Sequence, residues 1–268
     1  MEIEAPGDQQ AGGDLRLGER DRLVLAFAAE HRLILAAQAG VLLGVSTGAA
    51  AARLRTLTRA GHLRFERKLI GPGCYLIDRH GLRAIGSDLP RPRDVDLAAY
   101  GHDVGLGWLW LAANRGAFGR LDGVVSERRM RSHDARARGS SEPLGVRLPG
   151  AGPRGGARRH YPDLLLECGT GHRIAVELEL SGKGRVRREA ILGGYAADAR
   201  IDAVLYLVSD RAIGQAIERA AAKVGNSSRV LVQRVELPGA RGPAGQRSAD
   251  RVARRVPERA SAAPHLGR

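Results

Sequence analysis

The stretch between residues 161 and 235 constrains the fold more than any other part of the chain. Short apolar runs of strand length alternate in it with helical segments. The strand-like runs lie at 161–167, 174–180, 203–208 and 229–235, and the helical segments lie at 185–197 and 211–224. Such an alternation predicts strands that form one sheet covered by helices. We therefore expect an α/β domain here, within a chain that is α+β overall.

The second strand-like run carries two carboxylates on one face. Side chains alternate between the faces of a strand, so Glu177 and Glu179 share one side and Val176 and Leu178 share the other. We expect the apolar side to enter the core and the following helix to cover the acidic side, where buried carboxylates need partners. Asp163, which begins the neighbouring strand, can join them if the two strands pair. In the alternative interpretation, the glutamates are the polar face of an exposed edge strand.

This acidic cluster and the lysine that follows it suggest metal-dependent chemistry on phosphate. Clustered carboxylates repel one another unless a cation lies among them, and Mg²⁺ prefers such oxygen ligands. Lys183 could position or polarise a water for attack on a phosphodiester, a reaction that bound metals commonly assist. We assign Asp163, Glu177, Glu179 and Lys183 as candidate catalytic residues, with Mg²⁺ as the cofactor of an active site. Lys183 could instead contact a phosphate without a catalytic role.

Two other features near this cluster carry less weight. His102 and His160 are interpreted as surface or capping residues rather than as catalytic bases. Gly182 and Gly184 flank Lys183 without the glycine spacing of a P-loop. No nucleotide-binding loop is therefore expected.

Residues 18–86 predict three helices followed by a β-hairpin. Ser46 is a good N-cap for the third helix, and Gly61 is a suitable stop for it. The strand-like runs 62–68 and 74–77 flank a Gly-Pro-Gly turn. This order is typical of a winged helix-turn-helix domain, whose third helix enters the major groove of DNA.

Basic residues of the third helix and the hairpin are the candidate DNA contacts. They are Arg53 and Arg55 for the groove, with Arg59, Arg64, Arg67 and Lys68 as further DNA-binding residues. In the alternative interpretation, these residues only keep a small helical module soluble. A winged helix can also serve protein contacts instead of DNA binding.

The net charge of +14 points to a polyanionic partner, with double-stranded DNA first and an anionic membrane surface second. Most of the surplus lies in residues 128–160 and 238–268. It therefore reflects a sequence-independent affinity for polyanions, or a GC-rich coding bias towards Arg, more than the recognition helix. The two cysteines fit a reducing compartment, and we expect a cytoplasmic protein without membrane association.

The acidic motif resembles the signature of the PD-(D/E)XK restriction-endonuclease-like nucleases. Pro162 and Asp163 are followed, thirteen residues later, by Glu177-Leu178-Glu179. The resemblance implies a restriction-endonuclease-like α/β domain with a mixed sheet, in which Asp163 and Glu177 bind metal. The sequence departs from the signature where Glu179 occupies the usual lysine position, so that Lys183 is a displaced lysine or the site is inactive. Glu127 would be an accessory metal ligand.

The layout of the whole chain resembles the replication-relaxation family of mobile-element proteins. The resemblance covers about residues 20–225 and, besides the winged helix, includes His102-Asp103, Ser126-Glu127-Arg128, Tyr161-Pro162-Asp163, the run from Glu177 to Lys183 and Gly194-Tyr195. It implies a role in the replication, maintenance or mobilisation of plasmid or integrative-element DNA. If active, the enzyme would be a Mg²⁺-dependent DNA endonuclease or nickase, with replication or transfer proteins, or a second copy of the chain, as further partners.

Two other functional classes stay open from the sequence. One is a non-enzymatic winged-helix transcriptional regulator, and the other is an adaptor of DNA transfer, both with a degenerate nuclease fold. The expected organisation is the same for all of them: a disordered tail (1–17), the winged helix (18–86), a linker (87–97), the nuclease-like α/β domain (98–237) with a flexible basic insert (136–160), and a disordered basic tail (238–268).

Overall fold

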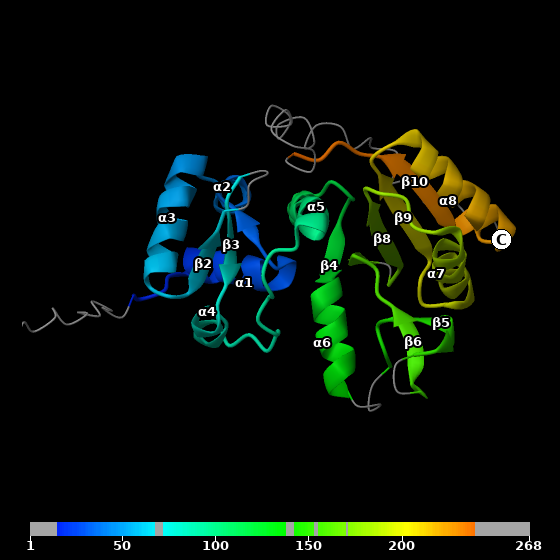
Figure 1. Cartoon of the computed structure of the whole chain (residues 1–268), viewed down its shortest axis with the longest axis horizontal. Coiled ribbons are helices and arrows are strands. Elements are labelled where there is room, and N and C mark those ends of the chain that lie inside the picture. Colours follow the sequence, from blue (N-terminus) through cyan, green and yellow to red (C-terminus); the bar gives the residue numbers. More distant parts are fainter. Residues whose placement is uncertain (1–14, 68–71, 138–141, 153–154, 170, 239–268) are drawn as a thin grey trace, which may run out of the picture.

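The chain is a mixed α/β protein, as the sequence predicts. The computed structural model (Figure 1) describes residues 15–67, 72–137, 142–152, 155–169 and 171–238. The terminal segments expected to be disordered therefore fall almost entirely outside the described residues. None of the helices in the described ranges combines the length and apolar character needed to cross a membrane.

The N-terminal part contains four helices and a small sheet. The helices are α1 (Glu19–His31), α2 (Ala36–Leu43), α3 (Thr47–Arg59) and α4 (Arg79–Ala84), and the strands are β1 (Ile34–Leu35), β2 (Leu63–Glu66) and β3 (Cys74–Ile77). The strand order is β1-β3-β2, and both pairs are antiparallel. The element order is the one expected for residues 18–86, with α4 and the short strand β1 in addition.

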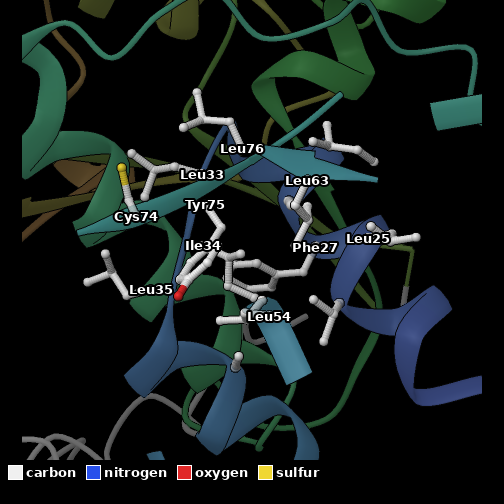
Figure 2. Close-up of a cluster of buried hydrophobic side chains, with 14 of the residues drawn as sticks. Leu25, Phe27, Leu33, Ile34, Leu35, Leu54, Leu63, Cys74, Tyr75 and Leu76 are labelled. Carbon is white, nitrogen blue, oxygen red and sulfur yellow. The ribbon is translucent and has the colours of Figure 1, made fainter. Parts of the chain in front are cut away.

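Local sequence signals explain where α3 begins and ends. The Ser46 hydroxyl accepts a hydrogen bond from the Ala49 N–H at 3.2 Å and caps the helix. Gly44 and Gly61 adopt positive φ values of 66° and 74° in the turns on either side, a conformation that costs a glycine little. The buried side of α3 then packs into the core of this part, where Leu54 lies with Phe27 of α1 and Tyr75 of β3 (Figure 2).

The C-terminal part is built on a five-stranded sheet. Its helices are α5 (Leu97–Ala113), α6 (Glu127–Ala137), α7 (Arg185–Ala197) and α8 (Arg211–Lys223). Its strands are β4 (Leu121–Ser126), β5 (Val146–Ala151), β6 (Ala157–His160), β7 (Leu164–Cys168), β8 (Arg173–Glu179), β9 (Ala203–Val208) and β10 (Val230–Arg234). The main sheet has the order β10-β9-β8-β7-β4, while β5 and β6 form a separate antiparallel pair.

The main sheet is mixed and lies between two helical layers. Strand β7 is antiparallel to both of its neighbours, whereas β8, β9 and β10 are parallel. Helix α5 covers one face, where Leu106 and Leu109 pack against Leu178. Helices α7 and α8 cover the other face, where Ile191 and Ile217 pack against the side of the sheet that carries Ala175 and the two glutamates.

Helix α5 belongs to both cores and joins the two parts of the molecule. Its Trp108 and Tyr100 lie in the N-terminal core, while Leu106 and Leu109 face the main sheet. The buried Gln38 of α2 donates a hydrogen bond to the Val104 carbonyl at 2.9 Å. Gly107 is required for this contact, because a Cβ there would lie 2.6 Å from the Gln38 amide nitrogen. The boundary expected near residue 97 therefore separates elements that share a core.

The expected flexible insert at 136–160 is corrected by the structure for its described residues, while residues 138–141 and 153–154 lie outside them. Helix α6 extends to Ala137, and β5 pairs with β6 in a ribbon packed against α7. The ribbon is ordered because Val146 and Leu148 alternate with exposed residues and are buried in the core. The ribbon also comes close to α7 at Gly194, where a Cβ would lie 2.9 Å from the Arg147 carbonyl oxygen.

Candidate active site

The predicted acidic residues meet where β7 begins and β8 ends. Leu164, the first residue of β7, pairs with Val176 of β8, so Asp163 lies beside the segment that carries Glu177 and Glu179. The glutamates are only 1% and 2% exposed. They lie on the side of the sheet covered by α7, which confirms the expected covered face and excludes the exposed edge-strand alternative.

Glu177 has three side-chain partners. The His160 Nε2 atom lies 2.6 Å from its Oε1, the Tyr195 hydroxyl donates to the same oxygen, and the Lys183 Nζ lies 3.5 Å from its Oε2. Burial alone would raise the pKa of this carboxyl group. The electrostatic interaction and hydrogen bond with His160, together with Lys183, outweigh burial and hold the pKa of Glu177 below its usual value. Glu177 is therefore a carboxylate at neutral pH.

Glu179 fixes the loop that carries the lysine. The Lys183 backbone N–H donates to its Oε1 at 2.9 Å, and the Lys183 Nζ lies 3.5 Å from its Oε2. Arg188 of α7 lies 3.5 Å from Oε1 and also donates to the Lys183 carbonyl at 2.8 Å. The Oε2 atom is buried and has no hydrogen-bond partner among the described residues. This leaves one acceptor of the cluster unsatisfied.

Lys183 lies beside the two glutamates, which the sequence alone did not establish. Burial would lower the pKa of its ammonium group, but the carboxylates of Glu177, Glu179 and Asp163 outweigh burial and raise it. Its side chain is 26% exposed, so the charged end is within reach of a ligand that approaches from solvent. A lysine four residues beyond the expected position thus reaches both glutamates.

Asp163 connects β8 to helix α5. Its Oδ2 accepts a hydrogen bond from the Leu178 N–H at 2.7 Å and lies 3.2 Å from the His102 Nε2. Burial would lower the pKa of His102, but the hydrogen bond and charge of Asp163 outweigh burial and raise it. His102 and His160, interpreted from the sequence as surface or capping residues, therefore both contact candidate catalytic acids. Their positions could have indicated these contacts, since His160 ends a strand just before Asp163 and His102 lies in the first turns of α5.

Glu127 does not join this cluster as predicted. Its carboxylate pairs with Arg131 at 2.8 Å and with Arg32 of the N-terminal part at 3.4 Å, and only its backbone N–H contacts Asp163, at the carbonyl oxygen. In the parts of the chain that the structure describes, no group of three or more His, Cys, Asp or Glu side chains is arranged to hold a metal. The predicted ligand set of Asp163, Glu177 and Glu127 is therefore not assembled here.

A second charged cluster, absent from the sequence predictions, lies next to the site at the junction of the two parts. Arg32 ends α1 with a positive φ of 69° and lies 3.8 Å from Asp103 of α5. Burial raises the pKa of Asp103 to about 6, even though Arg32 and His102 lower it. A positive φ in an arginine was not signalled by the sequence, since such a conformation is usually reserved for glycine.

The candidate DNA contacts divide into free and engaged side chains. Arg55 and Arg59 of α3 are exposed, and Arg67 is exposed just after β2, as predicted. Lys68 lies outside the described residues.

Two predicted DNA contacts are corrected. Arg53 donates two hydrogen bonds to the buried carboxylate of Asp21, so it joins α3 to α1. Arg64 pairs with Glu66 at 2.9 Å and with Asp94 at 2.7 Å, and it also donates to carbonyl groups of the 87–97 segment. Helical and strand periodicity placed both arginines outward, but each meets an acid that lies far away or in another element.

Comparisons with known proteins identify no relative of this chain. No family model matches the sequence, and no match is found among curated proteins or solved structures.

Proposed function

We propose that this chain binds double-stranded DNA and cleaves a phosphodiester bond at the site formed by Asp163, Glu177 and Lys183. One observation carries the proposal: the Lys183 ammonium lies 3.5 Å from each of two buried glutamates. Burying two carboxylates under a helix costs folding free energy, because both charges lose their hydration. A functional role would explain why the chain keeps them there. Phosphodiester hydrolysis uses such a combination of carboxylates and a cation.

Lys183 supplies the positive charge that the resemblance to PD-(D/E)XK nucleases places at residue 179. The backbone of Lys183 is fixed on both sides of its Cα atom. Its N–H donates to Glu179, and its carbonyl accepts a hydrogen bond from Arg188. The ammonium group is thus positioned without losing its exposure. In this proposal it binds the scissile phosphate or orients the attacking water.

The oxygen donors of the site fit a hard divalent cation. Mg²⁺ is usually held by one or two carboxylates, with waters and substrate phosphates as its other ligands, so a group of three protein ligands is not required. Asp163 and Glu177 would hold it, and the unsatisfied Oε2 of Glu179 offers a further acceptor nearby. When bound, the metal would activate a water and stabilise charge on the phosphate.

The N-terminal part would supply the DNA contacts of the proposed enzyme. Its order of helices and strands is typical of winged helix domains, in which the helix equivalent to α3 enters the major groove. Arg55 and Arg59 extend from the exposed side of α3, and Arg67 follows the hairpin strand β2. The resemblance to replication-relaxation proteins makes plasmid or integrative-element DNA the proposed substrate.

Incubation of the full chain with supercoiled plasmid and Mg²⁺ or Mn²⁺ tests the catalytic half. We expect the unchanged protein to convert the plasmid to nicked circles, and Glu177→Gln to lose this activity because its amide cannot replace a carboxylate as a metal ligand. Glu167→Gln is the matched control, since Glu167 lies on the adjacent strand and pairs with Arg173 at the surface. Equal nicking by the wild type and Glu177→Gln, or no nicking by the wild type, would contradict the proposal.

A second candidate function is a DNA-binding regulator without catalysis. It is favoured by the pairing of every candidate carboxylate with a positively charged or protonatable side chain of the chain itself. Asp163 contacts His102, Glu177 contacts His160 and Lys183, and Glu179 contacts Lys183 and Arg188. This function predicts binding to one DNA site that neither EDTA nor Glu177→Gln alters.

A further inference from the structure

The ribbon formed by β5 and β6 carries positive charges that have no acidic counterparts. Residues 146–160 contain four arginines and no Asp or Glu. Arg147 and Arg159 are directly opposite each other in the ribbon. Side chains at such positions share one face, and like charges there destabilise the pair. The ribbon therefore holds two positive charges side by side on one face.

The three of these arginines that the structure describes, Arg147, Arg158 and Arg159, form no ion pair with a carboxylate of the described residues. Arg147 and Arg158 are exposed, and no ion pair links either of them to an acid within the described ranges. The Arg159 guanidinium donates only to the Gly145 carbonyl, at 3.1 Å. Arg147 and Arg159 share one face of the ribbon and Arg158 lies on the other, so cations without acidic partners border the ribbon on both sides.

The ribbon leads directly into the candidate active site. His160, the last residue of β6, contacts Glu177 at 2.6 Å and packs edge-to-face against Tyr195. Arg158 shares the ribbon face of His160 because residues two apart on a strand point to the same side. Arg158 is therefore only two residues from His160, which contacts the candidate metal ligand Glu177.

The ribbon is held firmly enough to place these cations. Val146 and Leu148 are buried beside α7, and Gly194 of α7 allows the backbone of Arg147 to approach closely. Helix α7 also carries Tyr195 and Arg188, which contact the site glutamates. The ribbon and the site therefore share one support.

We propose that the β5–β6 ribbon binds the sugar-phosphate backbone of duplex DNA beside the cleavage site. A two-stranded ribbon has a width that a DNA groove admits, and arginine contacts to phosphates position a protein on a duplex. The inference rests on the proposed function only in its choice of DNA as the partner. It adds a second DNA-binding surface, separate from the exposed side of α3.

Salt-dependent binding of the full chain tests this surface. The probe is a fluorescent 30-base-pair duplex of arbitrary sequence, in EDTA and in a Glu177→Gln background, so that cleavage cannot contribute. Each phosphate contact contributes about 0.9 to the slope of log affinity against log salt. We expect Arg147→Ala/Arg158→Ala to reduce this slope by about 1 to 2, and to weaken binding at about 0.1 M salt by one to two orders of magnitude.

Two control variants distinguish DNA binding by the ribbon from a general effect of the net positive charge. Arg211→Ala/Arg219→Ala removes two exposed arginines from α8, outside the ribbon, and should leave the slope nearly unchanged. Arg147→Lys/Arg158→Lys should keep most of the wild-type slope, because the positive charges remain. Equal losses in the ribbon and α8 variants, or no loss in the ribbon variant, would overturn the proposal. A loss seen only with vesicles containing phosphatidylserine, and not with the duplex, would also overturn it.

The outcome is independent of the nicking experiment. Loss of slope in the ribbon variant supports the surface even if the wild type nicks no plasmid. An unchanged slope overturns the surface and leaves nicking by the wild type unaffected. Thermal unfolding of each variant should give a midpoint close to that of the wild type, since the replaced side chains are exposed.

Discussion

Two buried charge clusters, one in each part of the molecule, differ in how completely they are satisfied. Between α1 and α3, the Asp21 carboxylate receives two hydrogen bonds from Arg53 and another from the Gly18 N–H at 2.9 Å. Under α7, Glu177 and Glu179 share one lysine, and Glu179 Oε2 has no hydrogen-bond partner among the described residues. The first cluster is closed, whereas the second retains an unsatisfied acceptor.

This difference separates a structural role from a functional one. A closed pair of one acid and one guanidinium holds two helices together and offers nothing to a ligand. The cluster under α7 sets three carboxylates, including Asp163, against the two permanent cations Lys183 and Arg188. The imidazoles of His160 and His102 are its other partners, and the buried acceptor without a hydrogen bond among the described residues is the feature that favours a bound cation. The expected effects of mutation differ accordingly: activity should respond at the second cluster, and stability at the first.

The largest effect is expected from Lys183→Gln. Removal of one charged group that stabilises a transition state costs about 100-fold to 1,000-fold in rate, so plasmid nicking should fall by at least about 100-fold. Lys183→Arg should recover part of the activity, because the positive charge remains. Lys223→Gln is the matched control, since Lys223 is 58% exposed and pairs with Glu189 on the surface. A nicking rate for Lys183→Gln that equals the control would show that the second cluster is structural too.

The next effect is a loss of stability in Asp21→Asn. The carboxylate side chain is 4% exposed, whereas Arg53 is 38% exposed. Breaking a fully buried pair costs about 3 to 5 kcal/mol, and solvent access to Arg53 reduces the expected loss to about 2 kcal/mol. Urea unfolding measures it. The same measurement on Glu179→Gln should give a smaller loss, because the side-chain ion pairs of Glu179 are 3.5 Å long and its Oε2 has no hydrogen bond to lose among the described residues. The reverse order would contradict the contrast between the clusters.

Much of the second cluster was readable from the sequence because its determinants are local. Alternation along residues 174–180 fixed the common side of Glu177 and Glu179, and the following helix predicted their cover. The first cluster was missed because Arg53 and Asp21 are 32 residues apart. Helical periodicity places Arg53 outward on an isolated α3, and only the packing of α1 beside it brings the acid within reach.

The basic ribbon shows a second limit of local patterns. Glycine, proline and arginine dominate residues 136–160, and this composition is typical of a flexible loop. Only Val146 and Leu148 signal a buried face, and their partner surface on α7 lies more than forty residues away in the sequence. Pairing with a distant element therefore decides the structure of this segment. The contacts of His160 with Glu177 and Tyr195 depend on that same pairing.

Acid should weaken the first cluster in a predictable direction. Burial alone would raise the pKa of Asp21, but the hydrogen bonds from Arg53 and Gly18 hold it below the ordinary value of 3.8. A carboxyl group with a lowered pKa in the folded state stabilises the protein fully above its unfolded-state pKa and loses that contribution as pH falls through the folded-state pKa. Urea unfolding at pH 6 and pH 3 should therefore show the difference between wild type and Asp21→Asn shrinking on acidification. A difference that is constant with pH would assign the stability to shape rather than charge.

The smallest effect distinguishes two arginines of one helix. Arg55→Ala removes an exposed cation from α3 and should reduce the salt slope of duplex binding by about 1, with little change in the urea midpoint. Arg53→Ala should do the opposite, because it leaves Asp21 buried without its partner and contributes little to the exposed side of α3. Both variants remove one arginine from the same turn of α3. A difference between them in DNA binding or stability therefore reflects the position of the arginine and not the residue type. If Arg53→Ala weakened DNA binding as much as Arg55→Ala while the midpoint stayed constant, the guanidinium of Arg53 would be exchanging Asp21 for phosphate, and the first cluster would be open after all.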